Sequence, residues 1–242
     1  MSGNVKKEFG DYQTPLDFCY RVCNYIKESR LAEDAAAIME PTCGVGNFLL
    51  AASNTFACSK LIGIEVNAKR ADAARIEVPS ATIETNDIFN VSTKTLCGED
   101  CVLVIGNPPW ATNSELSFNL PPKTNFKGLR GIEAITGSSN RININDFKIL
   151  KLIGEYKHTN STICMLCKTS VARNVVSELS RNHIAYQKVE MLNFNSSKIF
   201  GISASACVLI IKLSTDEACA GEIVCEVKDF DKKSVIDTLI VS

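Results

Sequence analysis

The residues best suited to chemistry are Asn107, Pro108, Pro109 and Trp110, which directly follow the apolar run 102–106. A β-branched run that ends in glycine indicates a buried strand, and two prolines exclude a helix immediately after it. The Asn107 side-chain oxygen and the Pro108 carbonyl are acceptors for an amino group on a flat ring, and Trp110 offers a face for stacking. Since open α/β sheets bind ligands at the carboxyl ends of their strands, this tetrapeptide is a candidate catalytic site. The alternative is a turn that only ends a strand.

A glycine turn follows the first predicted strand. Residues 36–40 predict a short strand, Gly44 and Gly46 interrupt the chain after it, and the apolar residues that follow indicate a helix. A strand, a glycine turn and a helix in this order present backbone N–H groups to a ligand. Gly-x-Gly alone is weak evidence, so its value depends on the strand ends that follow.

Carboxylates follow the next two predicted strands. Glu65 ends the apolar run 60–65, and it comes about 20 residues after the glycines, a spacing at which such folds place an acid on ribose hydroxyls. Asp87 follows a predicted strand at 81–85 and is suited to accept a hydrogen bond from an adenine amino group. A turn or cap role is the alternative for Asp87.

Alternating strands and helices are predicted to position these residues. Further helices are expected at 15–30, with Thr14 as N-cap, and at 68–76, 146–156 and 170–181; further strands are expected at 162–167, 189–194, 204–213 and within 221–227. The pattern predicts an α/β fold with a doubly wound, mostly parallel sheet and helices on both faces. At 242 residues and 45% hydrophobic composition, the chain is expected to form one domain spanning 1–242.

Composition narrows the classes of function. No apolar run reaches membrane-spanning length and no signal peptide begins the chain, so a cytoplasmic protein without a membrane partner is expected. The eleven cysteines are scattered through apolar segments, and Cys164 and Cys167 lie within a predicted strand, so reduced core thiols are preferred to a metal site.

A long polar loop is predicted at about 111–145. The net charge of the whole chain is −1, but residues 121–151 hold six basic and two acidic residues and are locally at +4. Because contacts with phosphates need basic residues, the loop is interpreted as a segment that contacts nucleic acid, with a disordered insertion as the alternative. Its basic residues are Lys123, Lys127, Arg130 and Arg141.

Taken in order, the glycine turn, Glu65, Asp87 and Asn-Pro-Pro-Trp resemble the gamma class of S-adenosylmethionine-dependent amino methyltransferases that act on DNA. In that class a Tyr-x-Thr-Pro segment, here 12–15, precedes the glycine motif, and the similarity covers roughly residues 8–213. The resemblance implies a Rossmann-like class I methyltransferase fold, S-adenosylmethionine as cofactor and double-stranded DNA as partner. Trp110 departs from the Tyr or Phe that is more usual in the family.

The resemblance also implies roles for individual residues. Asn107 and Pro108 would accept hydrogen bonds from the exocyclic amine of the target base, and Trp110 would stack on it. Phe200 matches the place of an aromatic residue that packs against the extruded base, with an ordinary apolar anchor as the alternative. The implied cofactor-binding residues are Tyr12, Thr14, Glu40, Pro41, Cys43, Gly44, Gly46, Asn47, Phe48, Glu65, Val66, Asp87, Ile88, Phe89 and Asn107.

The expected reaction is methyl transfer to the exocyclic N6 of a flipped-out adenine in DNA, in a restriction-modification or related system. Motif order favours adenine over cytosine. A glutamine N5-methyltransferase acting on protein and a catalytically silent partner subunit are the alternatives. About 30 residues remain after the last strand that the resemblance covers. Sequence recognition is therefore expected from the long loop or from a separate subunit or domain.

Overall fold

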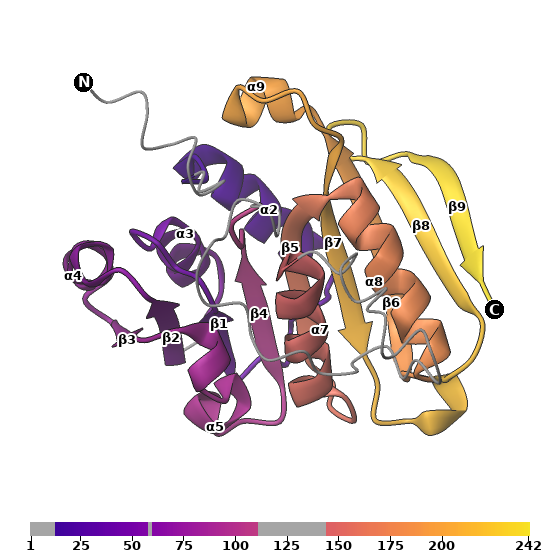
Figure 1. The fold of residues 1–242 in the computed structure, drawn as a ribbon, viewed down its shortest axis with the longest axis horizontal. Coiled ribbons are helices and arrows are strands. Elements are labelled where there is room, and N and C mark those ends of the chain that lie inside the picture. The colour runs from indigo at the N-terminus through magenta and orange to yellow at the C-terminus, as the bar shows by residue number, and fades with distance from the viewer. Residues whose placement is uncertain (1–12, 58–59, 111–143) are drawn as a thin grey trace, which may run out of the picture.

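One nine-stranded sheet organises the part of the chain that the computed structural model describes, residues 13–57, 60–110 and 144–242. The strand order is β3-β2-β1-β4-β5-β7-β6-β8-β9 (Figure 1). The strands are β1 (Ala37–Glu40), β2 (Lys60–Glu65), β3 (Ala81–Thr85), β4 (Val102–Gly106), β5 (Thr162–Lys168), β6 (Tyr186–Phe194), β7 (Ala206–Leu213), β8 (Ile223–Asp229) and β9 (Val235–Val241).

The sheet is mostly parallel, as predicted. Neighbouring strands from β3 to β5 are all parallel, and β8 runs parallel to β6. Strand β7 lies antiparallel between β5 and β6, and β9 is antiparallel to β8. Strand β9 is not predicted by the sequence pattern, because Asp237 and Thr238 divide its apolar residues and it lacks a two-residue alternation.

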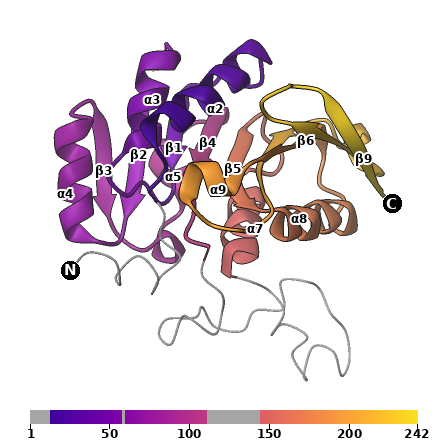
Figure 2. The same ribbon diagram turned by 90° about the horizontal axis from the view of Figure 1, so that it is seen from above.

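Helices cover both faces of the sheet, which confirms the doubly wound prediction. They are α2 (Leu16–Glu28), α3 (Asn47–Thr55), α4 (Ala68–Glu77), α5 (Thr93–Cys97), α7 (Ile144–Tyr156), α8 (Thr169–Arg181) and α9 (Ser196–Phe200), with short 3-10 helices at Ile88–Asn90 and Glu217–Cys219. Figure 2 shows α2 and α3 on one face and α7 and α8 on the other. Each pair packs its apolar side into a separate core cluster on its own face.

Three local predictions are corrected. Helix α2 begins at Leu16 with Pro15 as its N-cap and no side-chain cap bond, so Thr14 is not the cap. Helix α7 begins at Ile144, two residues before the predicted helix, and the rest of the predicted loop lies outside the described residues. The segment expected to be a loop between β6 and β7 contains α9. One-turn helices such as α9 and α5 are too short to show helical periodicity in a sequence.

The fold brings several strand ends to one edge. Because β1 to β5 are parallel, Glu40, Glu65 and Gly106 end their strands at the same side of the sheet. Strand β6 ends there too, since it and β5 are both antiparallel to β7. Among the described residues, none of the helices combines the length and the apolar character needed to cross a membrane.

Candidate functional site

The glycine turn between β1 and α3 depends on glycine at two positions. Gly44 and Gly46 have φ of +55° and +90°, in the left-handed region. A Cβ on Gly46 would lie 3.3 Å from Val78 Cγ2, so even alanine would press on the end of α4. The turn therefore keeps its backbone close to its neighbours and leaves N–H groups at the edge of the sheet.

Glu65 links the end of β2 to this turn. Its Oε2 accepts a hydrogen bond from Gly44 N at 2.9 Å, and its Oε1 accepts one from Asn67 N at 2.8 Å. The side chain is buried. The predicted ribose acid therefore lies beside the predicted glycine turn, and two backbone donors fix its orientation.

Glu40 is the second buried carboxylate of this edge. Its Oε2 accepts a hydrogen bond from Leu49 N, at 3.2 Å, in α3. Its Cγ would lie 3.4 Å from a Cβ on Gly106, which places it next to the residue before Asn107. Burial, reinforced by the nearby charge of Glu65, raises the pKa of Glu40 well above its ordinary value. A cationic ligand here would favour the ionised form again.

The segment before α2 lies against the glycine turn. Asn47 Nδ2 donates to the Thr14 carbonyl at 2.8 Å, and Val45 N donates to Gln13 Oε1 at 3.4 Å. Thr14 is buried. The structure thus joins two predicted cofactor residues, Thr14 and Asn47, that are far apart in sequence.

Two predicted cofactor residues turn their side chains into the core. Cys43 and Phe48 are buried in the cluster beneath α2 and α3, and burial raises the pKa of the Cys43 thiol. Their backbones remain part of the turn, so a contact with a cofactor would use backbone atoms.

The end of β3 combines a cap with apolar groups. Asp87 Oδ1 accepts from Phe89 N at 3.0 Å and so caps the short helix Ile88–Asn90, which confirms the cap role. Ile88 is buried, and Phe89 is partly buried against the same core cluster. Val66, which follows Glu65, is 69% exposed. An exposed valine beside the predicted ribose acid suits contact with a flat ring.

Asn107, Pro108 and Trp110 lie next to this edge, directly after β4. The Asn107 Oδ1 atom, Pro108 and the Trp110 ring are all buried. The Trp110 ring meets the Phe200 ring at 5.4 Å between centroids and 70° between planes, an edge-to-face contact. The two residues predicted to pack on the target base are therefore brought together by the fold.

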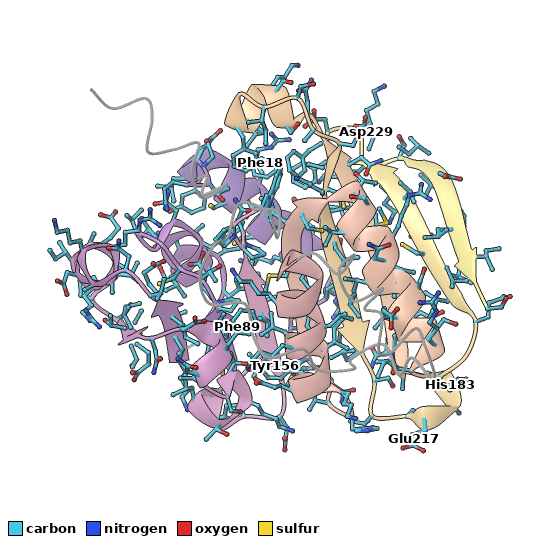
Figure 3. The ribbon with its side chains drawn as sticks, viewed as in Figure 1. Phe18, Phe89, Tyr156, His183, Glu217 and Asp229 are labelled. Atoms are coloured by element: carbon cyan, nitrogen blue, oxygen red, sulfur yellow. The ribbon has the colours of Figure 1, made fainter. Side chains whose placement is uncertain are left out.

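Phe194, which the sequence analysis missed as a site residue, supports this pair. Its ring lies 6.1 Å from that of Phe200 and 4.9 Å from that of Phe18 on α2, which Figure 3 labels. The sequence predicted Phe194 only as the last residue of the strand 189–194. The contact with Phe200 depends on the course of the chain after β6.

Thr42 is a second residue that sequence reasoning missed. Its Oγ1 is buried and has no hydrogen-bond partner among the described residues. Leaving such a hydroxyl unsatisfied costs about 1–3 kcal/mol. Since Thr42 lies between Glu40 and Gly44, a polar ligand held by the turn could satisfy it. This orphaned hydroxyl and the buried Glu40 fit a ligand with ammonium and carboxylate groups, such as the methionine end of S-adenosylmethionine.

Several predictions fall outside the part of the chain that the structure describes. Tyr12 and the basic residues of the predicted DNA-contacting loop, Lys123, Lys127, Arg130 and Arg141, lie outside the described residues. His183, which follows the C-cap of α8, is exposed and lies far from Phe18 (Figure 3). In the described ranges, no three His, Cys, Asp or Glu side chains are grouped to hold a metal ion.

Comparison with known proteins gives two curated relatives. The chain is 34% identical over 227 residues to the Type II methyltransferase M.NspV of Nostoc sp., an alignment that covers 88% of this chain and 47% of the relative. It is 35% identical over 112 residues to the Type II methyltransferase M.CvrRI of Paramecium bursaria Chlorella virus XZ-6E, covering 46% of this chain and 27% of the relative. The matched region spans less than half the length of either relative. No protein-family model matches the chain.

Solved structures show the same fold. A protein from Listeria monocytogenes described as a class I S-adenosylmethionine-dependent methyltransferase superposes with a TM-score of 0.59 at 13% sequence identity. The superposition covers 93% of this chain and 67% of the other. The mixed, mostly parallel sheet with helices is therefore the class I methyltransferase fold.

Proposed function

We propose that this chain, a homologue of Type II methyltransferases with a class I methyltransferase fold, methylates DNA at the exocyclic N6 of an adenine, in a restriction-modification or related system. S-adenosylmethionine would be the methyl donor and double-stranded DNA the partner. One observation carries the proposal: Asn107 follows β4 beside the carboxylates of β1 and β2, and its neighbour Trp110 contacts Phe200.

The turn and the strand ends would hold the cofactor. Thr14 and the segment 40–46 would bind its methionine end, where Glu40 suits the ammonium group. Glu65 would take the ribose hydroxyls; each of its oxygens accepts one backbone hydrogen bond and keeps a further lone pair for a hydroxyl. Asp87 Oδ2 would accept from the adenine amino group, with Val66, Ile88 and Phe89 around the ring. When bound, the sulfonium supplies an already activated methyl group.

Asn107 and Pro108 would prepare the amine for attack. The lone pair of an aromatic amine is delocalised into the ring, which makes the amine a poor nucleophile. Two acceptors on its hydrogens favour the pyramidal form, in which the lone pair points toward the methyl donor. Positioning for in-line attack then supplies much of the acceleration, and no strong base is required.

The aromatic pair would hold the base outside the duplex. Extruding a base costs a few kcal/mol, and stacking on an aromatic ring returns about 1–3 kcal/mol per base. The face of Trp110 would carry the base, with Phe200 as the adjoining wall.

Sequence recognition would come from outside the described residues. The basic residues between β4 and α7 would contact the DNA, or a separate subunit or domain would read its sequence. The relatives are more than twice as long as the region they share with this chain, which supports a contribution from further polypeptide.

Transfer of labelled methyl from S-adenosylmethionine to mixed-sequence duplex DNA, followed by nucleoside analysis, tests the proposal. We expect label in N6-methyladenine with the wild-type chain and none with Asn107→Ala. Label in N4-methylcytosine would keep the mechanism and overturn the choice of base. Label in glutamine of an added protein would favour a protein glutamine N5-methyltransferase. Cofactor binding without transfer to DNA would favour a catalytically silent partner subunit.

A further inference from the structure

The segment that carries Phe200 is a short helix, α9, that is capped at both ends. Asn195 caps α9 through a hydrogen bond from Lys198 N to its Oδ1, at 3.1 Å. Gly201, with φ of +69°, ends the helix, and its N–H donates to the Ser197 carbonyl at 3.0 Å. Phe200 is thus the last residue of a helix with a defined start and stop.

Ser196 ties this helix to the chain that follows it. Its side chain is buried, and its hydroxyl lies within hydrogen-bond distance of two carbonyls, at 2.9 Å from that of Ile202 and closer to that of Ala204. The same oxygen is 3.4 Å from Ala204 N, from which it can accept. One side chain therefore closes the loop from α9 to β7.

The neighbouring Ser197 makes a weaker version of the same contact. Its hydroxyl donates to the Ile202 carbonyl at 3.1 Å, but Ser197 is exposed and its hydroxyl forms no hydrogen bond with Ala204. Two adjacent serines on one helix thus differ in burial and in whether they reach residue 204. This difference provides a matched control.

The consequence of the closed loop is the position of Phe200. Its ring lies edge-to-face with Trp110 and is backed by Phe194. A loop that already holds these two adjoining rings together before the base arrives lowers the cost of ordering them on binding.

We infer that Ser196 is a positioning residue, which closes the loop 195–204 and thereby holds Phe200 against Trp110 as a preformed aromatic corner for the extruded base. The inference about the loop stands on the contacts above; its meaning for the base rests on the proposed function. Ser196 does not touch the reacting atoms and acts through Phe200.

Trp110 is the sole tryptophan of the chain, so its fluorescence reports on this corner without any substrate. Because the net contribution of one hydrogen bond is small, its removal should shift the equilibrium between closed and open forms of the loop by about 2- to 10-fold. We therefore expect Ser196→Ala to raise acrylamide quenching of Trp110 and to shift its emission to the red, while Ser197→Ala leaves both unchanged. Far-UV circular dichroism establishes that both variants are folded.

Gly201→Ala gives a second route to the same result. Its Cβ would meet nothing within 4 Å, but the positive φ disfavours alanine, so the variant loosens the end of α9 without touching Ser196. It should also expose Trp110. Unchanged quenching in both Ser196→Ala and Gly201→Ala would overturn the inference, whatever the outcome of the methylation assay.

Activity then tests the link to the base. We expect Ser196→Ala to raise KM for DNA by about 2- to 10-fold, with little change in kcat or in the affinity for S-adenosylmethionine. Added to Phe200→Leu, which already removes the ring, Ser196→Ala should have no further effect. Additive losses in the double variant would show that Ser196 acts on something other than Phe200. If the fluorescence changes but no DNA is methylated, the positioning stands and the proposed function fails.

Discussion

Buried glutamates occur in both halves of the sheet, but their partners differ. Glu40 and Glu65 end β1 and β2 and accept hydrogen bonds from backbone N–H groups. Glu190 lies within β6, fully buried, and is bound by Lys188 Nζ at 2.9 Å, by Lys228 Nζ, and by Tyr25 Oη at 3.1 Å. The first half of the sheet leaves its carboxylates at an edge, and the second encloses one between β6, β8 and α2.

The pKa values of Glu40 and Glu190 move in opposite directions. Burial and the charge of Glu65 raise the pKa of Glu40, and no Lys or Arg of the described residues forms an ion pair with it. Burial also opposes ionisation of Glu190, but hydrogen bonds from Lys228 and Lys188 outweigh it and lower its pKa. A buried carboxylate without a cation suits a cationic ligand, whereas one that has its lysines holds the sheet together.

The largest contrast should be between Asn107→Ala and Asn193→Ala, two asparagines near the ends of β4 and β6. Losing one preorganised polar group at the reacting atoms lowers kcat by about 100- to 1,000-fold, and we expect this for Asn107→Ala with cofactor affinity retained. Asn193 Oδ1 is buried without a hydrogen-bond partner among the described residues, so its removal should leave methylation and stability intact. Equal losses of activity in Asn107→Ala and Asn193→Ala would remove the distinction between the ends of β4 and β6.

Glu190→Gln should be the most damaging to stability. Breaking a buried ion pair typically costs about 3–5 kcal/mol, and we expect a loss at the lower end, measured by urea unfolding at pH 7. Since the pKa of Glu190 is lowered in the fold, its contribution is present above the ordinary carboxyl pKa of about 4.3 and is lost as pH falls through the folded value. The difference between wild type and variant should therefore shrink in acid. Glu226→Gln, at a more exposed partner of Lys228, should cost less.

Gly46→Ala should lower both the stability of the fold and the affinity for the cofactor. A left-handed conformation costs a non-glycine residue about 1–2 kcal/mol, and the added methyl would press on Val78. Gly98→Ala is the control, because Gly98 has a φ of +63° after α5 and its Cβ would be 3.6 Å from its nearest neighbour. Both variants should be destabilised, but only Gly46→Ala should bind S-adenosylmethionine more weakly in calorimetry. Weaker binding by both variants would mean that the turn has no special role.

Glu40→Gln should cause the smallest change in the stability of the cofactor-free protein. It should stabilise the fold, whereas Glu190→Gln and Gly46→Ala destabilise it. Because the pKa of Glu40 is raised in the fold, the folded state binds more protons, and wild-type stability falls as pH rises from the ordinary carboxyl pKa through the raised one. Glutamine does not ionise, so the variant should melt higher at neutral pH by roughly 2–4 °C, equivalent to about 1 kcal/mol. In thermal shift assays S-adenosylmethionine should stabilise the wild type increasingly as pH rises and the variant weakly at every pH. A variant that melts lower without cofactor would show that Glu40 is a structural group like Glu190.

The sequence predicted the part of the site that depends on local pattern. Glu40 and Glu65 end strands that hydrophobic runs identify, and the glycine turn, Asp87 and Asn107 follow such strands; parallel strands bring these ends to one edge. The cap role of Asp87 was also among the readings of the sequence, because a short acid after a strand commonly bonds to the backbone two residues on.

The sequence by itself therefore determined the order of β1 to β8 and of the longer helices, and the residues at the ends of β1 to β4, because these follow from the apolar pattern of each segment. Only the tertiary structure decided that Phe200 meets Trp110, that Glu190 meets Lys228, that Thr42 Oγ1 is buried without a partner among the described residues, and that β9 extends the sheet. Each of these depends on chain segments that are separated in sequence and become neighbours only through packing. A local pattern indicates that a side chain is buried, but the packing of the whole chain decides what it is buried against.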